Sequence, residues 1–108
     1  MQIISWNCRG LGNPLKAEAV KDLLKMEPSD ILLLQETKIE EEALLSIETL
    51  KWKKNVGMAV SAWGTSGGLA TLWSDDKFLL KPSYATQHWI YTKLRHLPSK
   101  ISISLFNL

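Results

Sequence analysis

The chain has 108 residues, 45% hydrophobic and 22% charged, which is typical of one globular domain and too short for two. Its net charge of +2 permits a nucleic-acid partner without arguing for one, because an electrostatic footprint requires clustered charge. One cysteine excludes an internal disulfide, and no apolar run approaches the roughly 20 residues that cross a bilayer. The N-terminus lacks the features of a secretory signal, so we expect an intracellular protein of the nucleus or cytoplasm, without membrane contact.

Residues 2–7 form a predicted strand with apolar side chains on both faces, which favours an interior position in a sheet. Asn13 followed by Pro14 is typical of a helix start, since an N-cap acceptor precedes a proline at the first helical position. Pro28 ends this predicted helix. Its expected apolar stripe has helical spacing and consists of Ala19, Val20, Leu23 and Leu24.

Residues 30–35 are almost continuously apolar, which indicates a strand covered on both faces. A strand, a crossover helix and a second strand pair their strands in parallel, with right-handed connection. Parallel strands end at the same edge of the sheet, where open α/β sheets keep their sites. We therefore expect Asn7 and Glu36, which end the two runs, to lie close together.

A second helix is predicted after Thr37, which with Glu40 fits a capping box. The apolar stripe of this helix would be Ala43, Leu44, Ile47 and Leu50. From residue 56 the pattern alternates with period two, and Gly64–Gly68 and Asp75–Asp76 are candidate turns. Consecutive strands with short connections predict an antiparallel meander, so the architecture is mixed α/β. The predicted strands are 56–63, 69–73, 78–83, 88–94 and 101–108.

The last predicted strand still alternates at Leu108, so we expect a truncated domain that self-associates through an exposed strand edge.

Glu36 and Asn7 are candidate site residues. A carboxylate at a strand end suits Mg²⁺, which takes one or two carboxylates with waters and a substrate phosphate. The amide of Asn7 could donate to a phosphate oxygen. Spacing alone favours a simpler interpretation, in which Glu36 caps the next helix or pairs with a lysine and Asn7 merely ends a strand.

Other constellations are weaker. The run GLGNPL after a strand has the layout of a dinucleotide-binding loop, but Leu15 replaces the third glycine and Pro14 removes an amide donor. Cys8 has no base that the sequence places beside it, so we interpret it as a buried strand residue. His88 and His96 are interpreted as structural or surface groups. Core packing is the favoured role for most of the five tryptophans.

Three segments, ISWNCRGLGN, DILLLQETK and SGGLATLW, resemble the start of the endonuclease/exonuclease/phosphatase superfamily. They are most similar to the endonuclease domain of plant LINE-type (non-LTR) retrotransposons. The resemblance implies a deoxyribonuclease-I-like fold, a four-layer α/β/β/α sandwich of which this chain is the N-terminal half. It also implies that Glu36 is the Mg²⁺ or Mn²⁺ ligand and that Asn7 organises the phosphate and metal site.

The resemblance implies a metal-dependent phosphodiesterase that nicks DNA by attack of water on phosphorus. The family's downstream tyrosine, its Asp-x-Asn pair and its late Asp–His pair find no match in this sequence. We therefore expect residues 1–108 to form a single truncated domain that is inactive, or nearly so, by itself. The alternative is a catalytically dead remnant that acts as a binding or interaction module.

Overall fold

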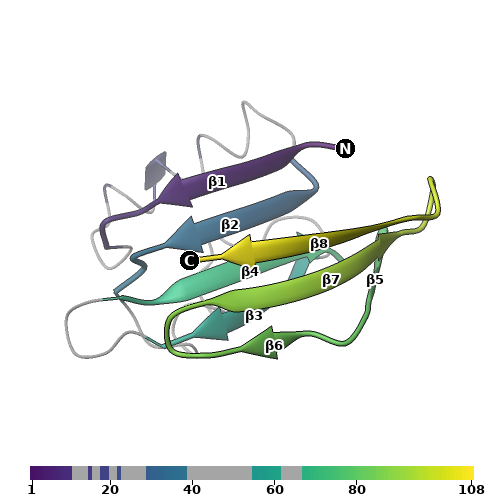
Figure 1. The fold of residues 1–108 in the computed structure, drawn as a ribbon. Coiled ribbons are helices and arrows are strands. Elements are labelled where there is room, and N and C mark those ends of the chain that lie inside the picture. Colours follow the sequence, from purple (N-terminus) through teal and green to yellow (C-terminus); the bar gives the residue numbers. More distant parts are fainter. Residues whose placement is uncertain (11–14, 16–17, 20–21, 23–28, 39–54, 62–66) are drawn as a thin grey trace.

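The computed structural model describes residues 1–10, 15, 18–19, 22, 29–38, 55–61 and 67–108. Its strands form two sheets (Figure 1). The strands are β1 (Ile3–Asn7), β2 (Ile31–Gln35), β3 (Asn55–Val60), β4 (Leu69–Ser74), β5 (Phe78–Leu80), β6 (Tyr84–Ala85), β7 (Ile90–His96) and β8 (Ile101–Asn107).

The first sheet has the strand order β1-β2-β4-β3. β1 and β2 are parallel, in a register that pairs Ile3 with Ile31 and Asn7 with Gln35, as the strand–crossover–strand pattern predicted. β4 lies antiparallel to both β2 and β3. The predicted interior position of the first strand is wrong for the described sheet: β1 is an edge strand, and Ile3 is 43% exposed. Apolar side chains on both faces did not distinguish an edge from an interior strand here.

The second sheet is built around β7, which pairs with β8 along one edge and with β5 and then β6 along the other. Between β5 and β6 the edge chain carries one residue more than β7, which is a bulge at Pro82 and Ser83. The Ser83 hydroxyl accepts a hydrogen bond from Lys93 N (3.0 Å) and donates one to Lys81 O (2.9 Å). The side chain thus replaces ladder bonds that a proline interrupts.

The predicted meander holds only in part. β3 and β4 are antiparallel neighbours, and so are β7 and β8. Between them the chain leaves the first sheet after β4 and enters the second at β5, so β4 and β5 are not neighbours. A turn at Asp75–Asp76 therefore changes sheets instead of closing a hairpin, which a local sequence pattern does not distinguish.

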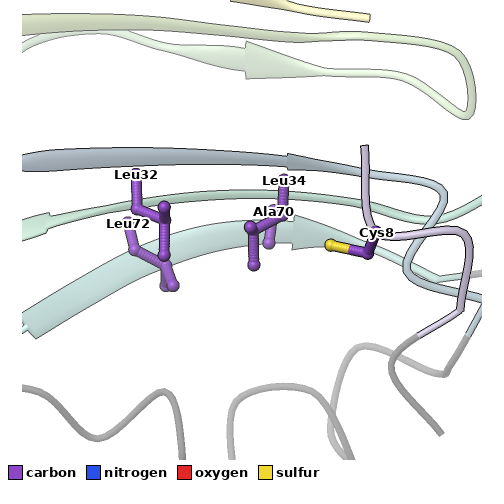
Figure 2. Close-up of a cluster of buried hydrophobic side chains, with 5 residues drawn as sticks. All are labelled: Cys8, Leu32, Leu34, Ala70 and Leu72. Carbon is purple, nitrogen blue, oxygen red and sulfur yellow. The ribbon is translucent and has the colours of Figure 1, made fainter. Parts of the chain in front are cut away.

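The two sheets pack face to face through an apolar cluster. Ile31, Leu33 and Trp73 of the first sheet contact Phe78 and Leu94 of the second, with Met58, Ile103 and Leu105 partly buried around them. A second cluster lies on the opposite face of the first sheet, and Figure 2 shows its side chains pointing away from β7 and β8. It consists of Cys8, Leu32, Leu34, Ala70 and Leu72. The interpretation of Cys8 as a buried residue is confirmed, since 1% of it is exposed, but Cys8 directly follows β1 and is not part of the strand.

The helix predictions are covered only in part. Leu15, Glu18, Ala19 and Asp22 are helical, within the first predicted helix. Ala19 is exposed, so its predicted place in the buried stripe is wrong. The second predicted helix, with Glu40 and the stripe after it, lies outside the described residues, as do residues 64–66 of the predicted glycine turn. In the described part of the chain, no helix is long and apolar enough to span a membrane.

Candidate functional site

The first sheet ends at a pocket. β1 ends at Asn7 and β2 at Gln35, which face each other in adjacent strands about 4.8 Å apart, and Glu36 follows directly. The predicted proximity of Asn7 and Glu36 is thus confirmed. Both line one pocket of about 240 Å³. Its walls are formed by Asn7, Gln35, Glu36, Gly67, Gly68, Leu69, Gln87, His88 and Leu108.

Backbone hydrogen bonds hold the Glu36 segment on two sides. Gly10 N donates to Glu36 O (2.7 Å), which extends the parallel ladder past the end of β1. On the other side, Thr37 N donates to Gly68 O (3.2 Å) and Lys38 N donates to Gly67 O (2.8 Å). The segment that carries the candidate metal ligand is therefore fixed between the chain after β1 and the chain before β4.

The backbone is strained at the same place. Arg9, Glu36 and Lys38 have positive φ angles of 52°, 50° and 58°, a region that side chains other than glycine rarely adopt. Each such residue costs about 1–3 kcal/mol and persists only where the surroundings over-determine it, most often at functional sites. Here the hydrogen bonds around Glu36 supply that constraint. Strain at both strand ends supports a functional role for this edge of the sheet.

The amide of Asn7 has a defined orientation. Its Oδ1 accepts a hydrogen bond from Arg9 N (3.2 Å), two residues along the chain. Within the described ranges, no group accepts from its Nδ2. Asn7 is exposed and lines the pocket, so the Nδ2 donor is available to a ligand there. This arrangement suits the donation to a phosphate oxygen that the sequence suggested.

Glu36 is half-buried and, among the described residues, is the one acidic side chain that lines the pocket. Among the described residues, no group of three or more His, Cys, Asp and Glu gathers to hold a metal. A structural or catalytic Zn²⁺ takes three or four protein ligands, so these residues do not fit zinc. Mg²⁺ takes one or two carboxylates and completes its shell with waters and phosphate oxygens. The donor set fits Mg²⁺ or Mn²⁺ in that manner.

Several pocket residues were missed by sequence reasoning. The sequence predicts only a turn at Gly67 and Gly68, whereas in the structure their carbonyls also hold the Glu36 segment. His88 was interpreted as a structural or surface group, yet it forms the pocket wall opposite Glu36 together with Gln87. No spacing rule relates His88 to Asn7, because the contact crosses from one sheet to the other.

Asn107 was also missed. It is 1% exposed, and its Oδ1 accepts from Gln35 Nε2 (2.8 Å) beside the pocket. Its Nδ2 lies within bonding distance of Ala70 O (2.9 Å), Leu34 O (3.2 Å) and Thr71 Oγ1 (3.3 Å). Asn107 thus joins the end of β8 to the first sheet. The sequence does carry a signal for this residue: Asn107 continues the alternating apolar positions Ile103 and Leu105, so a polar side chain stands where an inward-facing apolar one is expected.

Comparison with protein families matches residues 4–101 to the model of the Endonuclease/Exonuclease/phosphatase family. The chain belongs to this family. The match includes both strand ends of the pocket. Comparison with curated proteins gives no significant match.

Solved structures agree on the fold of this endonuclease/exonuclease/phosphatase chain. The AP endonuclease LMAP from Leishmania major superposes with a TM-score of 0.73 at 21% identity, over 97% of this chain and 38% of that one. The 3′ phosphatase NExo from Neisseria, bound to a product DNA hairpin, gives 0.63 at 21% over 96% and 40%. The human Nocturnin catalytic domain with a bound sulfate gives 0.62 at 22% over 96% and 47%.

These likenesses confirm the predicted fold class, the α/β architecture with mixed sheets of deoxyribonuclease-I-like proteins. The present chain spans less than half the length of each of these three structures.

Proposed function

We propose that this chain is the N-terminal portion of a Mg²⁺- or Mn²⁺-dependent phosphodiesterase that acts on DNA. The observation that carries the proposal is that Asn7 and Glu36, 29 positions apart in the sequence, line the same pocket, Asn7 at the end of β1 and Glu36 directly after the parallel strand β2. Membership of the family supports the class of reaction. The segments WNCRGLGN and LQETK support an origin in a plant LINE-type retrotransposon.

In this proposal Glu36 holds the metal ion and Asn7 positions the phosphate. A bound metal would polarise a phosphoryl oxygen and neutralise charge on the leaving oxygen. Asn7 Nδ2 would donate to a non-bridging phosphate oxygen, since Oδ1 is already held by Arg9 N. The clamped backbone on both sides of Glu36 would keep the carboxylate in place before substrate arrives.

The proposal assigns this chain binding rather than turnover. Attack by water needs a positioned base that removes its proton, and the Asp-x-Asn pair that helps to activate water in the family finds no match in this sequence. If Glu36 holds the metal, it is not free to act as that base. We therefore expect the 108-residue chain to bind DNA and metal but to leave a supercoiled plasmid intact.

Fluorescence anisotropy of a labelled DNA duplex tests this proposal, with Mg²⁺ and with a chelator. We expect Mg²⁺ to tighten binding by about tenfold and Glu36→Gln to abolish that gain, because an amide is a poorer Mg²⁺ ligand than a carboxylate. Glu18→Gln is the matched control, since it removes the same charge from an exposed helical residue. Binding without any Mg²⁺ dependence, or a Mg²⁺ gain that survives in Glu36→Gln, would overturn the proposal.

A second candidate function is an interaction module that pairs with another copy of the chain. The outer face of the second sheet carries a row of aromatic rings, with Tyr84 64% and Phe106 61% exposed. Tyr91 lies between them, with ring centroids 6.4 Å from Tyr84 and 4.8 Å from Phe106. Trp89 contacts Phe106 edge-on at 6.0 Å. Exposed apolar surface of this kind favours association in water.

Sedimentation velocity over a range of concentrations tests this second candidate. We expect dimers that Phe106→Ser weakens about tenfold, since the substitution removes a large ring from the row. Leu97→Ser is the control, because Leu97 is an exposed apolar residue that lies after β7 and outside the row. A monomer at all concentrations, or equal loss in both variants, would exclude this candidate.

A further inference from the structure

The wall of the pocket opposite Glu36 belongs to the second sheet. Gln87 and His88 come from the turn between β6 and β7, and Leu108 follows β8. The pocket therefore lies at the seam of the two sheets, with Asn7 and Glu36 on one side and His88 on the other. The C-terminal end of β8 lies beside the end of β2, so the two sheets meet at this edge (Figure 1).

The turn before β7 fixes the backbone of His88. Thr86 N donates to Trp89 O (2.8 Å), which closes the turn. The Thr86 hydroxyl accepts from both His88 N (3.2 Å) and Trp89 N (3.2 Å). Trp89 then packs its ring against Phe106 on β8. The position of His88 at the pocket is thus held by backbone bonds and an aromatic contact, without use of its imidazole.

The two histidines differ in what their rings do. His96 has a partner for Nδ1, since Ser99 Oγ lies 2.6 Å away, and its ring packs against Phe78 at 5.1 Å. Across the described ranges, the His88 ring has no hydrogen-bond partner, and the residue is exposed. An imidazole N–H at a pocket wall without a protein partner is available to a ligand that accepts hydrogen bonds.

The charge distribution indicates which ligand this wall attracts. All 11 Asp and Glu residues of the chain lie at or before residue 76. Residues 77–108, which form the second sheet, contain no acidic residue and five of the 13 Lys and Arg. The net charge of +2 for the whole chain does not reveal this uneven distribution of acidic residues. None of these cations lines the pocket, but the second sheet brings no acidic side chain to it and offers the imidazole of His88 as a hydrogen-bond donor. Such a donor suits an anion, and phosphate is the anion that a nucleic acid presents.

We propose that His88 contacts the phosphodiester phosphate from the side of the pocket opposite Glu36. Its imidazole N–H donates to a non-bridging phosphate oxygen, while Asn7 Nδ2 donates from the first sheet. This contact deepens the proposed function and rests on it, and its ligand is a nucleic-acid phosphodiester. The contact also gives the second sheet a role at the site: the second sheet supplies a hydrogen-bond donor, and the first sheet supplies the carboxylate.

Nitrogen-15 spectra of the two imidazoles test the contact directly. The full chain is titrated, in the presence of Mg²⁺, with a thymidine dinucleotide that carries one phosphodiester, and in parallel with inorganic phosphate. We expect the His88 ring signals to shift with saturation while those of His96 stay unchanged. His88→Gln and His96→Gln assign the signals. In the anisotropy assay we expect His88→Gln to weaken DNA binding about tenfold, as loss of a charge-assisted bond does, and His96→Gln to leave it unchanged.

The outcomes separate this inference from the proposed function. If the His88 signals do not move while Glu36→Gln still abolishes the Mg²⁺ gain, the His88 contact is wrong and the proposed function stands. If His88 stays unmoved and the Mg²⁺ gain is also absent, both fail together. Equal shifts of both histidines mean nonspecific binding and overturn the contact. A His88 shift with inorganic phosphate alone, and none with the dinucleotide, overturns the assignment to a phosphodiester.

Discussion

The two sheets of the molecule bury their strands in different ways. The central strands of the first sheet, β2 and β4, are buried on both faces almost throughout. The strands β7 and β8 of the second sheet alternate instead, with one face on the core and one open. A strand covered on both faces can offer chemistry only at its ends. This explains why the candidate metal ligand follows the end of β2, while the second sheet has a whole face free.

The comparison extends to charge. The first sheet supplies Glu36, and the second sheet supplies His88 and a surface without acidic side chains. In our account the pocket works because these two contributions meet at one edge. Substitutions at the contact between the two sheets therefore test this account first. The buried residue Asn107 lies at that contact.

Asn107→Leu should have the largest effect on stability. The change keeps the number of side-chain heavy atoms but removes the amide that bonds Gln35, Leu34 O and Ala70 O at the seam. We expect a loss of about 2–3 kcal/mol in the free energy of unfolding, since buried partners are left without bonds. Urea unfolding followed by circular dichroism measures it. Ser104→Ala, on the exposed face of the same strand, is the control, and equal midpoints for the two variants would contradict the role of Asn107.

Gly68→Ala should have the next largest effect. A Cβ at this position would overlap Thr37 Oγ1 and lie 3.0 Å from Lys38 N, and the φ angle of +93° adds strain. Gly67→Ala is matched to it, because its φ angle is +77° but nothing lies within 4 Å of the added atom. We expect Gly68→Ala to cost about 1–2 kcal/mol more than Gly67→Ala.

The same pair of glycine variants tests the clamp on the first sheet. Gly68→Ala should also reduce the Mg²⁺ gain in DNA binding, because it displaces the segment after Glu36. Gly67→Ala should change that gain less. If the two variants lose equal stability and equal Mg²⁺ dependence, the close contact between Gly68 and Thr37 has no importance for the site.

Thr37→Val should have the smallest effect, and in the opposite direction. Thr37 is fully buried, and no described residue bonds its Oγ1. Replacing that hydroxyl with a methyl group should raise the free energy of unfolding by about 1 kcal/mol. Thr71→Val is the matched control, since Thr71 is equally buried but its Oγ1 lies 3.3 Å from Asn107 Nδ2. We expect the control to destabilise, and the same sign for both variants would contradict this account.

The sequence predicted most of the features that follow from the spacing of apolar residues, namely the strands and the position of their ends. The apolar run of residues 30–35 gave a buried strand, and the strand–crossover–strand pattern placed Asn7 beside the end of β2. Periodicity could not place β1 at an edge, because Ile3 and Ile4 follow the same pattern in either position. It also missed the exposure of Ala19, since a small apolar residue is tolerated on either face of a helix.

The remaining parts of the site depend on contacts between sheets. His88 reaches the pocket only because the chain changes sheets between β4 and β5, and no local pattern predicts that step. Asn107 could have been noticed as a polar residue at an inward position, but its partners at Leu34 and Ala70 are 73 and 37 residues away. The sequence therefore predicted the site residues of the first sheet, Asn7 and Glu36. It did not predict His88 and Asn107, which reach the site from the second sheet.

One measurement tests the central claim, that the ends of β1 and β2 form a metal site at the seam. Mn²⁺ is added in substoichiometric amounts to ¹⁵N-labelled chain, and paramagnetic broadening of the amide signals is mapped residue by residue. The account predicts that broadening centres on Glu36 and reaches Asn7, Gly68 and His88, and that Glu36→Gln removes it while Glu18→Gln does not. Broadening that spreads over the acidic surface of the chain, or that persists at the pocket in Glu36→Gln, would contradict it.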